Sequence, residues 1–382
     1  MSVTPDESQE QEGPFLGTTA KYSDQTPKPT PGAARALRYQ AQSHARHILT
    51  GEARKKAPGK FAGDYYRTVD CRYVRHDDVS VQYSAVHEAA HYAGLVTCGS
   101  VWACPICASR IQERRRLEIE QAIQWAKAQG LVPVLVTLTF PHRAWQSLAE
   151  LILQQRDAFK RFRVSKGYRL LRPVGLIRSL EVTHGLNGWH PHTHELWFCD
   201  PQTLPGENML TSLWERACAA AGLLNPNDAD QVAAFRRHSV DVKDNMTAGD
   251  YLAKQDDSRS WGFSHEVAKA TSKLGRAKGV HPHRFLVRQD PGDSQRYIEY
   301  VEAMKGARQL YWSKGLKARV GVGDMSDEEV AQESREPAEI LGSLSLDDWT
   351  VIRSNDARAE VLDAAENGGW PAVQSLLAML RV

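Results

Sequence analysis

The chain has 382 residues, of which 42% are hydrophobic and 25% charged, an ordinary composition for a globular protein with a sizeable core. No apolar run approaches the roughly 18 residues that a membrane helix needs, and the polar, acidic start MSVTPDESQEQEG is unlike a secretory signal. Six cysteines are too few for a disulfide scaffold of this size, so we expect a reduced, cytoplasmic protein whose clustered cysteines bind metal.

The net charge of +2 hides a strong asymmetry along the chain. Residues 324–366 carry thirteen acidic residues and three arginines, whereas residues 1–323 hold 44 of the 48 basic and 33 of the 46 acidic residues, a net charge of +11. A basic body with an acidic tail favours a polyanionic partner such as nucleic acid over a merely uneven, solvated surface.

Composition divides the chain into four segments. Residues 1–60 form a disordered and then basic N-terminal arm, whose basic part over 34–60 fits a DNA-contacting arm and a soluble linker equally well. The other expected segments are a cysteine-rich zinc-binding segment over 61–115, a main domain over 116–323 and an acidic helical tail over 324–382.

Hydrophobic periodicity predicts an α+β fold. Strands are expected over 131–140, 171–184, 189–198 and 238–242, and helices over 114–129, 144–165, 208–222, 246–256, 264–274 and 292–312. This order describes a central antiparallel sheet flanked by helices, and Asn187-Gly188 indicates a tight hairpin between two of its strands. In the tail, SDEE over 326–329 has the form of a helix capping box.

The strongest chemical signal is WHPHTH over 189–194. Alternate residues of a strand face the same way, so His190, His192 and His194 project from one face. A hairpin centred between residues 186 and 187 places Glu181 opposite His192. Two histidines and a carboxylate on one sheet face suit a divalent ion with open coordination positions, whereas the alternative is three exposed histidines on a half-buried strand.

A second, weaker signal is AGDYLAKQ over 248–255. Tyr251 and Lys254 lie on one face of the expected helix. Beside a divalent ion, and with a lysine holding phosphate oxygens, a tyrosine becomes a usable nucleophile. The alternative for a lone tyrosine is packing; Tyr297 and Tyr300 are the substitutes to test if Tyr251 is not the nucleophile.

A zinc knuckle is predicted by Cys98, Cys104 and Cys107, the last two separated only by Pro-Ile. Cys71 is the best candidate for the fourth ligand, with His87 and His91 as competitors. The HEAAH sequence over 87–91 matches a zinc-protease motif but lacks an evident third ligand. We interpret His281-Pro-His283 as ordinary surface histidines, and Cys199 and Cys218 as buried apolar residues.

Three motifs resemble those of rolling-circle plasmid replication initiators, which belong to the His-hydrophobic-His (HUH) single-strand endonuclease superfamily. They are TLTFPH over 137–142, WHPHTHELW over 189–197 and YLAK over 251–254, in that order. TCGSVWACPIC upstream and the run from SHEVAKATSKLGR to LYWSKGLK downstream also look similar, so the resemblance covers roughly residues 65–320.

The resemblance implies a ferredoxin-like sheet and an endonuclease domain over 116–323. His192, His194 and Glu181 would hold Mg²⁺ or Mn²⁺, Tyr251 would be the nucleophile and Lys254 its phosphate-binding partner. Thr193 departs from the bulkier apolar residue usual between the two histidines. Thr247 stands where relatives carry a second Tyr or a Glu that ends the reaction, a step for which Asp244 is a substitute.

The function expected from the resemblance is replication initiation. The enzyme would nick one strand of a plasmid or phage origin, hold the 5′ end on Tyr251 and leave a 3′-OH primer. Partners would be single-stranded origin DNA, a host helicase and a polymerase, with no membrane. The expected DNA contacts are His190, Thr137, Thr139, His142, Arg114 and Arg115. The alternatives are a transposase with the same chemistry and a non-catalytic, zinc-dependent DNA-binding regulator.

Overall fold

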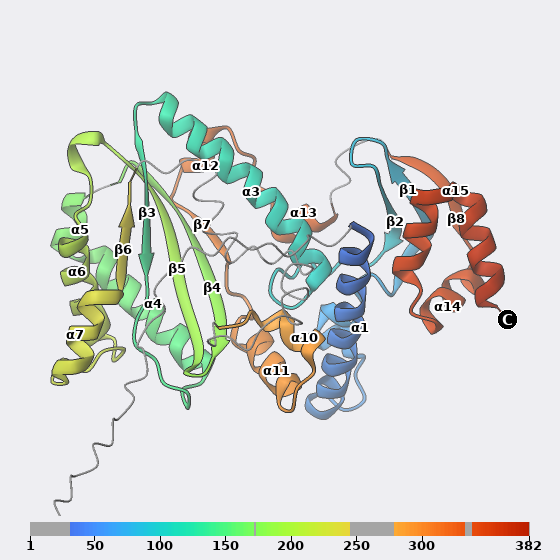
Figure 1. The fold of residues 1–382 in the computed structure, drawn as a ribbon, viewed down its shortest axis with the longest axis horizontal. Helices are drawn as coiled ribbons and strands as arrows, with labels where there is room; N and C mark the ends of the chain where they lie inside the picture. The colour runs from blue at the N-terminus through green and yellow to red at the C-terminus, as the bar shows by residue number, and fades with distance from the viewer. Residues whose placement is uncertain (1–30, 172, 245–278, 333–337, 382) are drawn as a thin grey trace, which may run out of the picture.

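The computed structural model describes residues 31–171, 173–244, 279–332 and 338–381. Within them the chain is α+β, as predicted, with two antiparallel sheets flanked by helices (Figure 1). The larger sheet has five strands in the order β6 (Val240–Lys243), β3 (Val132–Leu138), β5 (Gly188–Cys199), β4 (Gly175–Gly185) and β7 (Leu310–Trp312).

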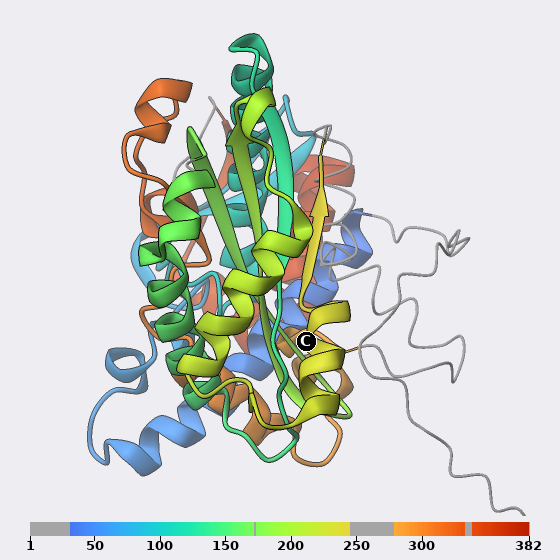
Figure 2. The same cartoon turned by 90° about the vertical axis from the view of Figure 1, so that its left-hand side faces the viewer.

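Helices cover both faces of the larger sheet. On one face α3 (Pro105–Ala128) and α12 (Leu316–Val320) pack on apolar side chains that include Leu135, Ile177 and Leu196. On the other face lie α4 (Leu148–Val164) and α6 (Glu207–Ala220), which Figure 2 shows in front of the strands. The short α5 (Lys166–Leu171) follows α4, and α7 (Ala229–His238) leads into β6.

The β4–β5 hairpin has the predicted register. Gly185 pairs with Gly188 across a two-residue turn, which places Glu181 opposite His192. Gly188 has a φ of +80°, and a Cβ added there would lie 2.8 Å from the Cα of Ala144. Only glycine meets both conditions without strain, so this residue terminates the turn and fixes the pairing of both strands.

The smaller sheet joins segments from both ends of the chain. Its order is β2 (Ala89–Leu95), β1 (Arg75–Ser84) and β8 (Glu339–Leu344). Helices α14 (Leu346–Ser354) and α15 (Arg358–Leu380) pack beside it (Figure 1). The ring of Trp370 lies against Gly342. The tail therefore packs on the hairpin that lies between Cys71 and Cys98 in the chain.

Part of the segment that the sequence assigned to an N-terminal arm, residues 1–60, also belongs to the hydrophobic core. They form α1 (Pro31–Lys56), a helix that packs against α15, α3 and α10 (Phe285–Arg288). Its buried residues Ala41, Ala45, Leu49 and Ala53 follow a spacing of four, the spacing of one helical face. The short α2 (Ala62–Tyr65) and the 3₁₀ turn η1 (Arg67–Val69) continue it toward the cysteines.

Several predicted elements differ from the structure. The helix expected over 292–312 is α11 (Asp293–Ala303), and the chain then turns at Gly306, with a φ of +73°, to form the edge strand β7. The sequence reading missed α7, and β8 lies in the tail expected to be helical. The predicted capping box is present at the start of α13 (Asp327–Gln332), where Ser326 and Glu329 exchange hydrogen bonds.

The interpretation of His281 and His283 as surface histidines was wrong. His283 is 3% exposed, and its Nε2 lies 2.6 Å from the carbonyl oxygen of Trp102. Burial, only partly offset by that hydrogen bond, lowers the pKa of His283 to about 4.

Among the described residues, no helix is long and apolar enough to cross a membrane.

His283 should make the fold acid-sensitive. Unfolded histidine binds a proton below a pH of about 6.5, whereas folded His283 resists protonation down to a pH of about 4. Stability is therefore lost as the pH falls through this window, by up to about 3 kcal/mol. Denaturant unfolding of the wild type and of His283→Gln at several pH values checks this; equal pH dependence in both proteins contradicts it.

Candidate functional site

The central hairpin brings Glu181, His192 and His194 together on one sheet face. The Oε2 of Glu181 lies 3.2 Å from the Nε2 of His192 and 3.6 Å from the Nε2 of His194. All three ligand atoms lie within 4.8 Å of one another, and each side chain keeps about 15% of its surface exposed. The two ring nitrogens and the carboxylate oxygen thus converge on one point that solvent can reach.

The remaining ring nitrogens hold the histidines in place. The Nδ1 of His192 lies 3.3 Å from the carbonyl oxygen of His190, and the Nδ1 of His194 lies 3.0 Å from the hydroxyl of Thr137. A carbonyl can only accept a hydrogen bond, so His192 donates from Nδ1, and Nε2 is the ring nitrogen that faces Glu181. Metal-binding histidines are oriented by this kind of partner.

The site carries a carboxylate close to two imidazoles. Burial opposes the charge of Glu181, but His194 and His192 outweigh it and hold the pKa of this carboxyl well below its usual range. Two imidazole nitrogens and one carboxylate oxygen form a donor set that fits a divalent cation and leaves further coordination positions open.

His190 lies on the same sheet face as His192 and His194, but its ring nitrogens hydrogen-bond to other residues. Its Nδ1 lies 2.8 Å from the Nε2 of His142, whose Nδ1 lies 2.9 Å from the carbonyl oxygen of Asn187. Its own Nε2 lies 3.4 Å from the hydroxyl of Thr139. Burial lowers the pKa of both His190 and His142. His190, His142 and Thr139, all expected to contact DNA, are therefore joined by hydrogen bonds beside the histidine pair.

Arg114 and Arg115, also expected to contact DNA, form ion pairs within the chain. Both lie on α3 near Glu118, at 3.3 Å and 2.9 Å, and Arg115 also reaches Asp327 of α13 at 3.0 Å. With 11% of its side chain exposed, Arg115 joins α3 to α13.

The expected nucleophile and its lysine, Tyr251 and Lys254, lie outside the described residues, as does Thr247. Asp244, the substitute for the termination step, is exposed directly after β6. Tyr297 and Tyr300 are fully buried, and burial raises the pKa of both hydroxyls well above the usual range. Neither can reach a DNA phosphate in this fold.

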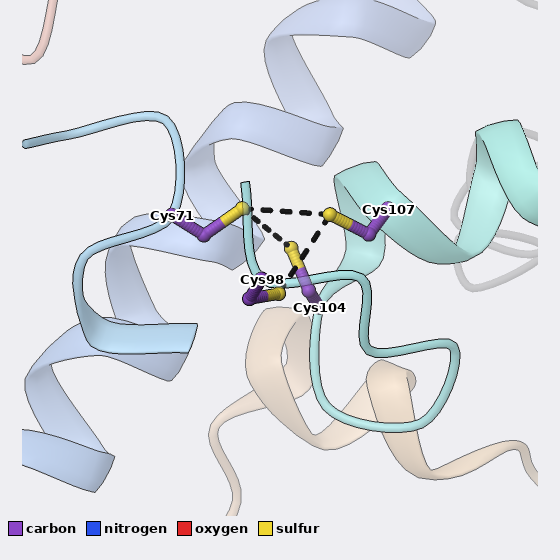
Figure 3. A group of neighbouring side chains, drawn as sticks. All are labelled: Cys71, Cys98, Cys104 and Cys107. Carbon is purple, nitrogen blue, oxygen red and sulfur yellow. Dashed lines mark hydrogen bonds between the residues drawn. The ribbon is translucent and has the colours of Figure 1, made fainter. Parts of the chain in front are cut away.

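A second cluster consists of four cysteines whose sulfur atoms face one another (Figure 3). The Sγ of Cys71 lies 3.5 Å from that of Cys107 and 3.6 Å from that of Cys104, and Cys98 lies 3.7 Å from Cys107. Disulfide sulfurs lie about 2.05 Å apart, so all four are free thiols. Four sulfurs around one zinc, each at about 2.3 Å, lie about 3.8 Å from one another. The observed cluster is close to that tetrahedron.

Local structure explains how the cysteines meet. Cys71 follows η1, Cys98 follows β2, and Cys104 and Cys107 occupy the cap and first turn of α3, where Pro105 starts the helix. The amide of Ser100 and the hydroxyl of Thr68 donate to the sulfur of Cys98. The sequence analysis predicted no role for Thr68. The only signal for one was its position three residues before Cys71.

The competing histidines lie elsewhere. His87 lies in a turn and His91 on β2, while Glu88 between them has a φ of +48°. HEAAH therefore forms no helix, and its histidines do not share the helix face that a zinc protease needs.

A family model and one relative over most of the chain indicate a replication protein. A family model described as "Replication protein" matches residues 93–340. A Streptomyces lividans protein named "Protein rep" is 27% identical over 354 residues, covering 73% of each chain. A "Neomycin resistance protein" of Streptomyces cyanogenus is 30% identical over 137 residues, which is 28% of this chain and 31% of its own. No solved structure matches the chain.

Thr137→Val should weaken divalent metal binding at the histidine pair. Valine keeps the β-branched shape but removes the hydroxyl that orients His194, and losing such a partner typically costs about 10- to 100-fold in affinity. Titration with Mn²⁺ followed by calorimetry measures this. Thr183→Val is the matched control, because that hydroxyl bonds no histidine ring among the described residues; equal losses in both would contradict the assigned role.

Cys104→Ser should release about one bound zinc per chain and destabilise the region around the start of α3, since structural zinc contributes directly to folding free energy. Elemental analysis of protein purified without chelator, together with thermal unfolding, tests this. Cys199→Ser also alters a buried thiol but lies outside the cluster, so it should keep the zinc. Wild-type protein that holds no zinc would refute the assignment.

Proposed function

Because this chain belongs to the replication protein family, we propose that it initiates rolling-circle replication by nicking one strand of a plasmid or phage origin. Residues 116–323 form the endonuclease domain of this proposal, an HUH-type domain. It binds single-stranded origin DNA, with host helicase and polymerase acting after it.

One observation carries the proposal. Glu181, His192 and His194 converge on a solvent-accessible point, and Tyr251 and Lys254 follow them in the chain in the order of the resembling initiators. A catalytic ion, Mg²⁺ or Mn²⁺, would be held by these three side chains and would draw charge from the scissile phosphate. A buried, purely structural site would not need an open face.

The chain's own groups supply the rest of the proposed reaction. The phenolic oxygen of Tyr251 attacks phosphorus, a tyrosine–5′-phosphate bond forms, and the P–O3′ bond breaks to leave a 3′-OH. Lys254 neutralises the phosphate oxygens beside it. Thr137 and the carbonyl of His190 keep both ligand histidines oriented through the step.

The four cysteines support a second, structural role. We propose that Cys71, Cys98, Cys104 and Cys107 bind one Zn²⁺ that fixes the start of α3 beside α1 and α11. Among the alternatives, a transposase would use the same chemistry, but the matched family is one of replication proteins. A non-catalytic regulator would leave the histidine–carboxylate site without a role.

Tyr251→Phe should bind single-stranded origin DNA with near-normal affinity and form no covalent adduct. Phenylalanine keeps the ring and removes only the attacking oxygen, while Lys and Arg contacts to phosphates supply most of the affinity. Incubation with origin strands and Mg²⁺ or Mn²⁺, followed by mass spectrometry of the peptides, measures the adduct.

Two further variants give this experiment its controls. His192→Ala keeps the tyrosine but removes one metal ligand, so it should lose nicking at the same DNA affinity. His190→Ala should lose less, because its ring nitrogens bond to His142 and Thr139. A phosphotyrosine adduct in Tyr251→Phe would show that another tyrosine attacks, and no adduct in the wild type would sink the proposed function itself.

A further inference from the structure

A large open groove lies next to the proposed catalytic face and has no role in the chemistry above. Its volume is about 1360 Å³. Its walls come from residues 64–68, the loop that holds Cys98, Arg115 of α3, the chain from the end of α11 through β7 to α12, and the segment leading into α13. One wall includes residues of LYWSKGLK, a motif that the proposed mechanism does not use.

Strand pairing relates the position of the groove to that of the histidine pair. His194 of β5 pairs with Ser179 of β4, which pairs with Leu310 of β7, and Leu310 lines the groove. Directly paired residues project from the same face. His194 and Leu310 are therefore two strand spacings apart, about 10 Å, on the same side of the sheet.

The charges of the groove are segregated. Lys305, Arg308 and Lys314 are exposed along one wall and form no ion pair with any residue that the structure describes. The wall formed by residues 324–329 is acidic, and three of its acids are paired with cations: Asp324 with Lys317 at 2.8 Å, Asp327 with Arg115 at 3.0 Å and Glu328 with Arg67 at 3.6 Å. Lys305, Arg308 and Lys314 are thus available to an external anion.

Aromatic rings accompany the basic wall. Tyr65 is 36% exposed, and the Nζ of Lys305 lies 5.5 Å from the centre of its ring. Trp312 lines the groove from β7. A row of cations next to exposed aromatic rings is the combination with which proteins bind single strands, because phosphates contact the cations and bases stack on the rings.

We propose that this groove binds the single-stranded DNA flanking the nick, with phosphates along Lys305, Arg308 and Lys314 and a base stacked on Tyr65. The acidic wall limits the affinity and keeps the strand on the basic side. This inference rests on the proposed function, since it assigns a second binding surface to the same substrate.

The test measures binding of labelled oligothymidylates of about 6 to 20 nucleotides, a range that covers known single-strand site sizes, to the full chain at several salt concentrations. The triple variant Lys305→Ala, Arg308→Ala, Lys314→Ala should bind about tenfold or more weakly, and its salt dependence should fall by about 2, from three phosphate contacts at about 0.7 each. Tyr65→Leu should also bind about tenfold more weakly, with an unchanged salt dependence.

A matched control removes the same charge elsewhere. Lys160→Ala, Lys166→Ala, Arg169→Ala clears three exposed cations from α4 and α5, the helices of the opposite sheet face. It should bind like the wild type, and equal losses in both triple variants would overturn the proposal. So would normal binding in the groove variant, the result expected if the groove takes an acidic protein segment instead.

A variant that should bind more tightly separates an effect of charge from a loss of binding caused by misfolding. Asp324→Asn with Glu328→Gln makes the groove more positive, so it should bind oligothymidylate several-fold more tightly; unchanged or weaker binding would count against the proposal. The covalent adduct on origin strands is assayed in parallel. Its absence in the wild type refutes the proposed function, whereas its presence with unaltered binding by the groove variant refutes the groove alone.

Discussion

The pairing of β4 with β5 is the constraint on which the histidine–carboxylate site depends. Because side chains alternate along a strand, a slip of one residue would turn Glu181 away from the face that carries His192 and His194. The two-residue turn before Gly188 prevents that slip, since the backbone there has a φ of +80° and passes close to Ala144. The same register places Leu196 and Ile177 against α3, so the core and the site stabilise one arrangement.

The acidic tail shows how a charge pattern can serve the fold itself. Arg35 of α1 pairs with Asp363 and Glu366 of α15. Arg358 is fully buried, donates hydrogen bonds to the side chain of Gln42 and the carbonyl of Arg72, and pairs with Asp356. A buried arginine is costly unless such partners are supplied. Part of the negative tail therefore holds α1 and the smaller sheet together.

The two clusters follow different physical rules. Nε2 atoms and a carboxylate converge on a partly exposed point, where an ion could also contact a substrate. Four buried sulfurs leave no such access and bring the chain after η1 and the chain after β2 to the first turn of α3. In each cluster a threonine hydroxyl hydrogen-bonds to one member, Thr137 to the ring of His194 and Thr68 to the sulfur of Cys98.

Local sequence determined the features that depend on near neighbours. The hairpin, its register, the common face of the histidines and the capping box at Ser326 all follow from strand alternation and turn or cap chemistry. Only the tertiary structure decided what depends on distant partners. Cys71 rather than His87 or His91 joins the sulfur cluster, His283 is buried, and β7 and β8 form because β4 and β1 offer them open edges. Strands of three and six residues carry too little periodicity to be recognised, because their stability comes from pairing with strands far away in the chain.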